Sequence, residues 1–324
     1  MTSQTSFWQP ACSMAHLRKR AEVLGWLRAF FAQREVMEVD TPLLCHASVT
    51  DVHLASVTTH LTYPGDEGKV SYLQTSPEFS MKRLLAAGSG PIFQICKAFR
   101  GGERGRRHNP EFTMLEWYRP TFSLAQLMDE VEALLASLGV IGTARRTSYR
   151  QAFITHAGVD PYAASDDELK QLAEESSGIA GSLLDRDGAL DVILTHRVEP
   201  LLGVDGPEFI TGYPASQAAL AKVCEIDGYL QAQRFELYID GLELANGYDE
   251  LVDADEQLRR FEQDNRQREA MGLPTIAVDH RLVAALKQGL PPCSGVALGV
   301  DRLLMVLLDT RNIDDVLAFP VDCT

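Results

Sequence analysis

The amino-acid sequence predicts an α+β fold that contains both helical and strand-like segments. Three observations support this fold class. A helical pattern fills residues 14–33, strand-like runs follow between residues 36 and 99, and a hairpin pattern appears at residues 235–247. The chain has 324 residues, enough for one large domain or two modest ones. We expect a single domain over residues 1–324, with a helical insertion at about residues 121–203.

The first element is an amphipathic helix over residues 14–33. A second apolar stripe of Val23, Trp26 and Phe30 runs beside the first and widens the apolar arc. Such a helix could lie between its own core and a partner subunit, or at the centre of a monomer, and the pattern leaves both open. The first stripe recurs at spacings of three and four: Leu17, Ala21, Leu24, Leu27 and Phe31.

Short runs of β-forming residues follow the first helix. They lie at residues 36–39, 54–61, 69–74 and 92–99. Within the insertion, acidic amphipathic helices are predicted at residues 124–138 and 166–175, and Gly and Ser residues separate them.

The remaining elements begin with the hairpin at residues 235–247. Asp240 and Gly241 form a two-residue turn of the kind that joins antiparallel strands. A charged helix is predicted over residues 253–271. Residues 294–308 have the pattern of a glycine-punctuated strand that runs into an apolar helix.

The net charge of −15 argues against a general nucleic-acid binder, because phosphate backbones favour a basic surface. We therefore expect no stable nucleic-acid partner. One local basic patch is possible, since five cationic residues lie close together in the sequence: Lys82, Arg83, Arg104, Arg106 and Arg107.

The sequence also indicates where the protein resides. No run reaches the ~18 apolar residues that a membrane span requires, and charged residues interrupt the N-terminal stretch where a signal sequence would lie. The six cysteines lack metal-binding spacing, so we expect free thiols in a reducing compartment. We expect a cytoplasmic protein with no membrane partner.

A nucleotide site, if present, must be built without the common glycine-rich motifs. The chain has neither the P-loop pattern nor the G-x-G-x-x-G pattern. Residues 99–116 offer another route, because a strand ends at Arg100, a basic glycine-rich loop turns, and a second strand begins at Phe112. Arg100 could hold an α-phosphate with two parallel hydrogen bonds, His108 could reach the terminal phosphates, and Phe112 offers a flat face to adenine. A solvated basic hairpin loop is the alternative.

Two further segments accompany this loop. A Val-Asp-Thr-Pro run at residues 39–42 is a weak signal alone, because proline often ends a strand. In residues 294–305, glycines at alternate positions let a flat ligand lie on the strand backbone, and Arg302 emerges beside that floor. Tight glycine packing is the alternative, but it does not explain the charged pair Asp301 and Arg302 in an apolar run.

The hairpin at residues 235–247 carries two carboxylates. With a two-residue turn, Tyr238 pairs with Glu243, and Glu236 lies on their face as a diagonal neighbour of Glu243. Glu236 and Glu243 are therefore the predicted ligands of Mg²⁺, a cation that prefers carboxylate and phosphate oxygens. Two more carboxylates are either substrate ligands or ordinary surface residues of an acidic protein: Glu78 and Glu250.

In this order, residues 39–44, 99–116 and 294–305 resemble motifs 1, 2 and 3 of the class II aminoacyl-tRNA synthetases. The resemblance implies an antiparallel sheet flanked by helices, a homodimer formed through motif 1, and ATP bound in a bent shape.

The same resemblance implies roles for single residues. Arg100 and Arg302 would be catalytic, with Arg100 on the α-phosphate and with His108 and Arg302 on the β- and γ-phosphates. Adenine would lie between Phe112 and Arg302. Six further residues would contact ATP: Gly102, Glu103, Asn109, Glu243, Leu244 and Gly299.

Three segments look like the lysyl-tRNA synthetase branch of that family. They are Ser-Pro-Glu-x-x-x-Lys-Arg-Leu from residue 76, His-Asn-Pro-Glu-Phe-Thr-Met-Leu-Glu-Trp-Tyr from residue 108, and Glu-Leu-Ala-Asn-Gly-Tyr from residue 243. This implies that Glu78, Tyr118 and Glu250 surround the side-chain ammonium of the substrate. That group has a reference pKa of about 10.4 and is costly to bury without carboxylates. The other implied substrate ligands are Ser76, Pro77, Asn246 and Tyr248.

The resemblance runs from about residue 14 to 320. Only about a dozen residues precede the first helix, so we expect no anticodon-binding OB-fold domain. The Gly-Val-Ala-Leu-Gly-Val-Asp-Arg run that begins at Gly295 is similar to that of the elongation factor P–lysine ligases. Those enzymes transfer (R)-β-lysine from its adenylate to a lysine ε-amine of elongation factor P, a protein shaped like tRNA. The resemblance implies an ATP-dependent, Mg²⁺-dependent ligase that takes (R)-β-lysine or lysine and modifies elongation factor P.

Two departures from the family pattern stand out. Gly102 occupies the position where motif 2 usually has an acid, which leaves Glu103 as the substitute, and Ala297 replaces a motif 3 glycine. Two alternatives stay open. One is a minimal lysyl-tRNA synthetase-like enzyme that charges tRNA or makes dinucleoside polyphosphates. The other is a non-catalytic regulatory paralogue, which Gly102 supports and which the charged residues argue against: Arg100, Glu236, Glu243 and Arg302.

Overall fold

The computed structural model describes residues 8–61, 68–140 and 142–324, and the chain folds into two compact units. The first unit contains Met1–Thr121, Val252–Pro292 and Ala297–Thr324. The second contains Phe122–Leu251 and Cys293–Val296.

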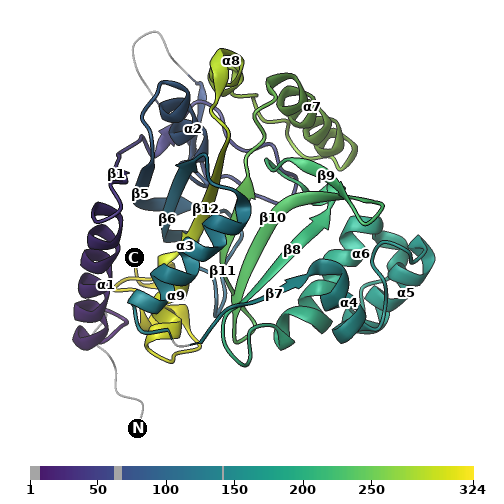
Figure 1. Ribbon diagram of the computed structural model, residues 1–324, viewed down its shortest axis with the longest axis horizontal. Coiled ribbons are helices and arrows are strands. Elements are labelled where there is room, and N and C mark those ends of the chain that lie inside the picture. The colour runs from purple at the N-terminus through teal and green to yellow at the C-terminus, as the bar shows by residue number, and fades with distance from the viewer. Residues whose placement is uncertain (1–7, 62–67, 141) are drawn as a thin grey trace. The chain divides into compact units, whose positions relative to one another are not determined.

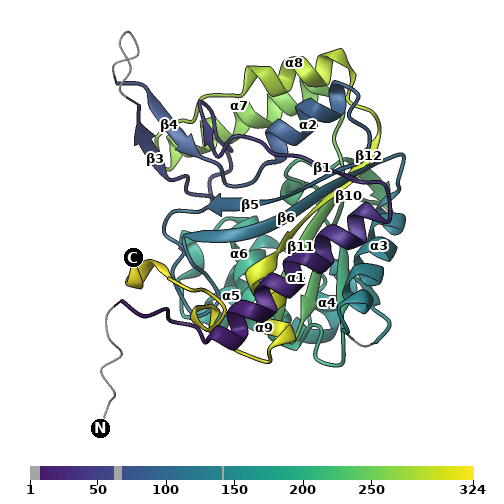
Figure 2. The ribbon, with the colours of Figure 1, turned by 90° about the vertical axis from the view of Figure 1, so that its left-hand side faces the viewer.

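The first unit begins with α1 (Met14–Ala32), which confirms the predicted N-terminal helix (Figure 2). The Ser13 side chain caps the helix by accepting a hydrogen bond from the His16 N–H group at 3.1 Å. Both predicted stripes contribute buried residues, Leu27 and Phe31 from the first and Val23 and Phe30 from the second. Phe31 stacks on Phe93 with ring centroids 4.5 Å apart, so aromatic packing fixes the helix on the sheet of this unit.

The sheet of the first unit is built on a long hairpin. Strand β5 (Ile92–Phe99) pairs antiparallel with β6 (Glu111–Pro120), and β1 (Met37–Glu38) pairs parallel with β5 on its other side. The pairing of Phe99 with Glu111 leaves the intervening loop to carry the basic residues.

A three-stranded sheet also belongs to the first unit, in the order β2 (Leu44–Cys45), β4 (Val70–Leu73) and β3 (Thr58–His60). The strand predicted at residues 54–61 is therefore wrong in its first half, because strand structure begins only at Thr58.

Four helices complete the first unit: α2 (Glu78–Ala86), α7 (Ala254–Ala270), α8 (His280–Gly289) and α9 (Val300–Leu307). Figure 2 shows α2, α7 and α8 grouped on one side of β5 and β6. The prediction of a charged helix is confirmed by α7, whereas α2 and α8 were not predicted. Strand β12 (Cys293–Gly299) leads into α9, as expected, and its residues are divided between the two units.

The second unit holds a sheet in the order β11 (Leu242–Asp249), β10 (Tyr229–Ile239), β8 (Glu208–Pro214) and β7 (Arg145–Ser148). Strand β9 (Val223–Ile226) pairs with β10. The pairing of β7 with β8 is parallel, whereas β10 pairs antiparallel with β8, β9 and β11. Asp240 and Gly241 both have positive φ, of 50° and 65°, which confirms the predicted tight hairpin.

Four helices belong to the second unit: α3 (Leu124–Ser137), α4 (Tyr149–Ala157), α5 (Asp166–Ser177) and α6 (Arg186–Ile193). Figure 1 shows α4, α5 and α6 grouped beside β7 and β8. The insertion predicted at residues 121–203 is thus mainly helical but also contributes β7 to the sheet. Short helical turns lie at Gly181–Leu183, Leu194–Val198, Glu199–Leu201, Ala215–Gln217, Ile313–Asp315 and Val321–Cys323.

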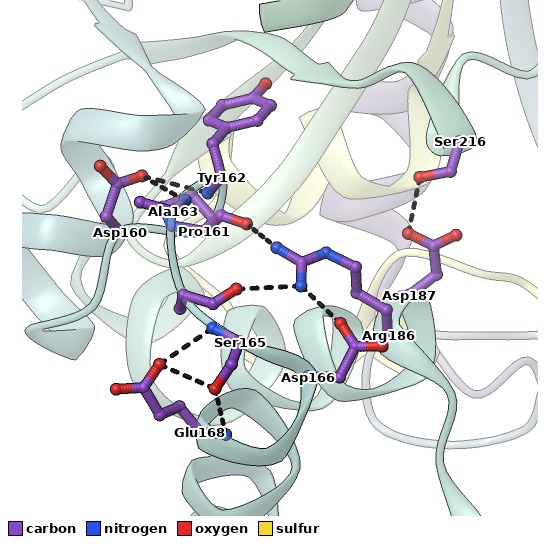
Figure 3. A network of polar contacts seen from close by, with 11 residues as sticks. Asp160, Pro161, Tyr162, Ala163, Ser165, Asp166, Glu168, Arg186, Asp187 and Ser216 are labelled. Carbon is purple, nitrogen blue, oxygen red and sulfur yellow. Dashed lines mark hydrogen bonds and ion pairs between the residues drawn. The ribbon is translucent and has the colours of Figure 1, made fainter.

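A polar network links α5, α6 and the segment before α5 (Figure 3). Arg186 of α6 donates to the Pro161 carbonyl at 2.7 Å, the Ala164 carbonyl at 3.0 Å and the Asp166 carboxylate at 2.6 Å. Ser165 and Glu168 form a capping box at the start of α5. Arg186 therefore donates hydrogen bonds to backbone carbonyl groups of the loop between α4 and α5. This gives the network a structural role.

No helix in the described ranges is long and apolar enough to cross a membrane. All six cysteines are free thiols, as predicted.

Candidate active site

Arg100 lies at the start of the loop between β5 and β6, and one of its side-chain donors has no acceptor among the described residues. The Arg100 N–H group donates to the Pro110 carbonyl at 2.9 Å, and Gly105 and His108 close the loop tip through two backbone hydrogen bonds. The Arg100 Nε atom is buried and has no hydrogen-bond partner among the described residues. Its guanidinium carbon lies 5.3 Å from the Phe112 ring centroid. A buried guanidinium donor without an acceptor is suited to an anion such as a phosphate.

The loop also explains the Gly102 departure. Gly102 has a φ of 78°, a conformation that an L side chain adopts only with strain. The backbone therefore favours glycine at the place where the family pattern has an acid. Glu103, the expected substitute, is half-buried in the same loop.

His108 and Arg302 are brought together, as predicted. The Arg302 Nη2 atom lies 2.7 Å from His108 Nε2, and Arg302 Nε donates to the Arg107 carbonyl at 3.4 Å. The surrounding protein and the charge of Arg302 both lower the pKa of His108, although solvent reaches the ring. A neutral imidazole can accept the Arg302 hydrogen bond at Nε2, so this pair presents one strong positive charge.

Gly299 lies directly beneath Arg302. A Cβ atom at Gly299 would lie 3.8 to 3.9 Å from the side-chain carbons of Arg302. The arginine stem therefore covers the glycine at the end of β12, consistent with the predicted flat floor beside Arg302.

Asn109 is already engaged within the protein. Its Nδ2 donates to the Glu111 carbonyl at 2.6 Å, and its Oδ1 accepts from the Val321 N–H group at 3.0 Å. Asn109 thus ties the loop to the C-terminal segment, and any role toward ATP would add to this structural one.

A cluster of polar residues forms around β6 and the start of α2. Ser76 Oγ donates to Glu116 at 3.0 Å, and the Tyr118 hydroxyl donates to the other Glu116 oxygen at 2.7 Å. The Glu78 N–H group donates to Ser76 Oγ at 3.0 Å. Three predicted substrate residues, Ser76, Glu78 and Tyr118, are therefore held in one cluster, next to the buried Pro77.

Two members of this cluster were not predicted. Glu116 is 2% exposed and links Ser76 to Tyr118. Lys82 is 1% exposed, and its Nζ atom lies 2.6 Å from Glu78 Oε1. Its assignment to a basic surface patch is wrong, because helical spacing from Glu78 turns Lys82 into the protein. A carboxylate within the apolar strand from Thr113 to Trp117 was the available signal for Glu116.

The remaining predicted residues lie on the hairpin of the second unit. Tyr238 pairs with Glu243, as predicted, but a register shift after Leu237 pairs Glu236 with Asn246. The expected diagonal placement of Glu236 and Glu243 is therefore wrong in register, because one extra residue lies in β11. Glu243 and Tyr248 are half-buried, and Leu244 and Glu250 are buried.

The two predicted Mg²⁺ ligands, Glu236 and Glu243, differ in their surroundings. Within the described ranges, no group of three or more His, Cys, Asp or Glu side chains is arranged to hold a metal ion. The Glu236 carboxylate accepts from Tyr213 and Tyr238, each at 2.6 Å, and also bonds to Arg234. Glu236 does not fit a metal ligand, whereas the half-buried Glu243 can still contribute one carboxylate.

Comparison with known proteins places the chain in a family. A model of the class II tRNA synthetases (D, K and N) matches residues 9–323. Proteins named elongation factor P–(R)-β-lysine ligase are 51% identical to this chain over 323 residues, and the aligned region covers 99% of this chain and 99% of each relative. Two such relatives come from Yersinia pestis (strain Pestoides F) and Yersinia pseudotuberculosis serotype O:1b (strain IP 31758). The predicted α+β fold class is confirmed, and the chain belongs to the class II tRNA synthetase family of the D, K and N type.

Proposed function

We propose that this protein is an ATP-dependent ligase that activates (R)-β-lysine, or lysine, as its adenylate and transfers it to a lysine ε-amine of elongation factor P. Similarity to enzymes of that name carries this proposal, because it extends over 99% of both chains at 51% identity. The Arg100, His108 and Arg302 arrangement in the first unit supports the use of ATP.

The reaction has two steps. In the first, a carboxylate oxygen of the amino acid attacks the α-phosphorus of ATP, and pyrophosphate leaves. Arg100 would bind the α-phosphate through its free Nε donor, and Arg302 would bind the β- and γ-phosphates. In the second step the neutral ε-amine of the acceptor lysine attacks the carbonyl carbon of the adenylate. The C–O bond to AMP breaks, an amide bond forms, and the amine loses its proton.

Mg²⁺ would supply charge neutralisation for the triphosphate, and Glu243 is the carboxylate that we propose for it. The residues of this chain position the phosphates and the amino acid, and positioning provides most of the catalytic effect for such a transfer.

Carboxylates are the groups that we propose for recognition of the substrate's ammonium groups. In the first unit these are Glu78 and Glu116, with the Tyr118 hydroxyl bonded to Glu116. In the second unit the proposed carboxylate is Glu250, which is 1% exposed. An ammonium group is costly to bury without carboxylate partners, which supports a role for these groups toward a diamino acid.

A homodimer would cover an apolar strip on the first unit. Met14 and Trp26 of α1 and the adjoining Met37 are 53%, 59% and 50% exposed, and Leu43 and Leu44 are more than one-third exposed. Exposed large apolar side chains of this kind are consistent with a protein interface.

The function can be tested by mass spectrometry of elongation factor P after incubation with ATP, (R)-β-lysine and the protein. We expect one added lysyl group on the wild-type acceptor and none on an acceptor whose target lysine is changed to arginine. A parallel reaction replaces elongation factor P with tRNA. Efficient charging of tRNA with no added mass on elongation factor P would contradict the proposal and favour a tRNA-charging enzyme.

A further inference from the structure

The carboxylate of Glu236 is surrounded by donors of its own unit. Glu236 is 6% exposed, and its Oε2 atom accepts hydrogen bonds from the Tyr213 and Tyr238 hydroxyls, each at 2.6 Å. Its Oε1 atom bonds to Arg234 Nη2 and lies 3.4 Å from Asn246 Nδ2. A carboxylate has about four acceptor positions, and four donors face them here.

The donors around Glu236 keep their protons. Burial and then the charge of Glu236 raise the pKa values of Tyr213 and Tyr238 well above the ordinary tyrosine value. Burial opposes the charge on Arg234, but Glu236 and neighbouring tyrosines outweigh it and raise the pKa of Arg234. A hard cation would have to displace one of these donors to reach Glu236.

Arg234 connects this carboxylate to Asn246. Its guanidinium carbon lies 4.4 Å from the Tyr213 ring centroid, and its Nη1 donates to the Gln217 carbonyl at 2.9 Å. Its Nε lies 3.3 Å from Asn246 Oδ1. The Asn246 side-chain oxygen thus accepts a hydrogen bond from Arg234, and its nitrogen donates to Glu236. These two contacts fix the orientation of the amide.

We propose that Arg234 and Glu236 are positioning residues that hold the Asn246 amide for the amino-acid substrate, and that Glu236 is not a ligand of Mg²⁺. This inference rests on the proposed function for the assignment of Asn246 to the amino acid. It differs from the metal role expected from sequence, because the charge of Glu236 balances Arg234 within the protein.

Two substitutions at Glu236 separate the two roles. Glu236→Gln keeps the shape, since its carbonyl can accept from Arg234 and Asn246 while its amide donates to the tyrosine oxygens. We expect this variant to keep the Mg²⁺ concentration at half-maximal activity within about twofold of wild type, and the KM for (R)-β-lysine within about fivefold, because it retains the network. Glu236→Ala removes the network and should raise the KM for the amino acid about tenfold or more.

The measurement is amino-acid-dependent exchange of pyrophosphate into ATP by the full chain, with Mg²⁺ and (R)-β-lysine varied separately. Glu208→Ala is the matched structural control. Glu208 is 5% exposed in the same unit and bonds to Arg145 at 2.9 Å, Thr147 at 2.6 Å and the Gly203 N–H group at 3.0 Å. We expect this control to lower the midpoint of urea unfolding and to leave the KM for (R)-β-lysine unchanged.

A double-mutant cycle tests whether Glu236 acts through Asn246. After Asn246→Ala, the further change Glu236→Ala should raise the KM for the amino acid by less than about twofold, because the group being positioned is already gone. Independent, multiplicative effects would overturn the positioning role. A Mg²⁺ requirement raised about tenfold in Glu236→Gln, with an unchanged KM for the amino acid, would instead identify Glu236 as a metal ligand.

A second readout separates this inference from the proposed function. Binding of ATP in the presence of Mg²⁺ is measured by calorimetry with wild type and Glu236→Gln, and neither elongation factor P nor an amino acid is needed. Equal affinities support the inference about the metal even if wild type transfers nothing to elongation factor P. A Glu236→Gln variant that binds ATP normally without Mg²⁺ but loses the Mg²⁺-dependent gain would overturn it.

Discussion

The half-buried Arg20 of α1 and the buried Asp301 of α9 form an ion pair, with Arg20 Nη1 located 2.5 Å from Asp301 Oδ1. The other Asp301 oxygen accepts the Thr113 N–H group at 2.6 Å, and Arg20 Nη2 donates to Thr113 Oγ1 at 2.5 Å. Asp301 therefore joins the first helix, strand β6 and the helix that carries Arg302. This contact accounts for a charged residue within the apolar run of α9.

We expect Asp301→Ala to destabilise the protein by about 3–5 kcal/mol, because it leaves the Arg20 charge and the Thr113 N–H group without their acceptor. Urea unfolding of the full chain measures this change. The double variant Arg20→Met with Asp301→Ala should be less destabilised than the sum of the single variants, since no lone charge remains buried. Strict additivity would contradict the coupling.

Arg100→Ala should reduce amino-acid-dependent exchange of pyrophosphate into ATP by about a hundredfold or more. The loss of one charge-assisted contact to developing phosphate charge costs on the order of 3 kcal/mol. Arg83→Ala is a suitable control, because Arg83 is an exposed arginine of the same unit and has no assigned role. Exchange that proceeds equally well without any amino acid would contradict an adenylate mechanism.

Local sequence signals predicted several elements with close bounds. The hairpin of β5 and β6 begins at the expected Ile92, and the Asp240-Gly241 turn folds as its chemistry requires. The left-handed backbone at Gly102 gives a physical reason for an unusual residue that the sequence pattern could only flag.

Local sequence signals did not predict the contacts between residues that are far apart in the chain. Arg20 and Asp301 are 281 residues apart, so no local pattern indicates that they pair. The extra residue in β11 shifts Glu236 onto Asn246, and no alternation pattern reveals a bulge in advance. No helix was predicted at residues 78–86, where α2 lies, and so the burial of Lys82 was missed as well.

The stability of the protein should depend on pH through His108. Its pKa is lowered in the folded state by its surroundings and by Arg302, so the unfolded state binds a proton more readily. The contribution of neutral His108 is present above the ordinary histidine pKa of about 6.5 and is lost as the pH falls below that value. Urea unfolding between neutral pH and about pH 5 should therefore show a smaller loss of stability in His108→Asn than in wild type. Identical pH profiles would contradict this assignment.

Glu250→Gln should weaken the use of lysine-like substrates and leave ATP binding nearly intact. Glu250 is 1% exposed at the end of β11, where its N–H group donates to the Cys293 carbonyl at 3.0 Å. The substitution keeps the shape and removes the charge that would meet an ammonium group. Substrate KM from exchange kinetics and ATP affinity from calorimetry measure the two effects. An equal loss for ATP and the amino acid would show that Glu250 does not act on the amino acid alone.

Restoring the usual motif 2 acid should not improve the enzyme. Gly102→Asp places a side chain at a φ of 78°, where space is open but the left-handed backbone costs an L residue about 1–2 kcal/mol. Gly102→Asn should be no worse tolerated, since asparagine adopts this conformation more readily than most residues, and Gly102→Val should be the worst because its β-branch crowds the backbone. Urea unfolding ranks the three variants, and exchange kinetics give their KM for ATP. A Gly102→Asp variant with full stability and a lower KM for ATP would show that the loop adapts to the acid, and that Glu103 has not replaced it.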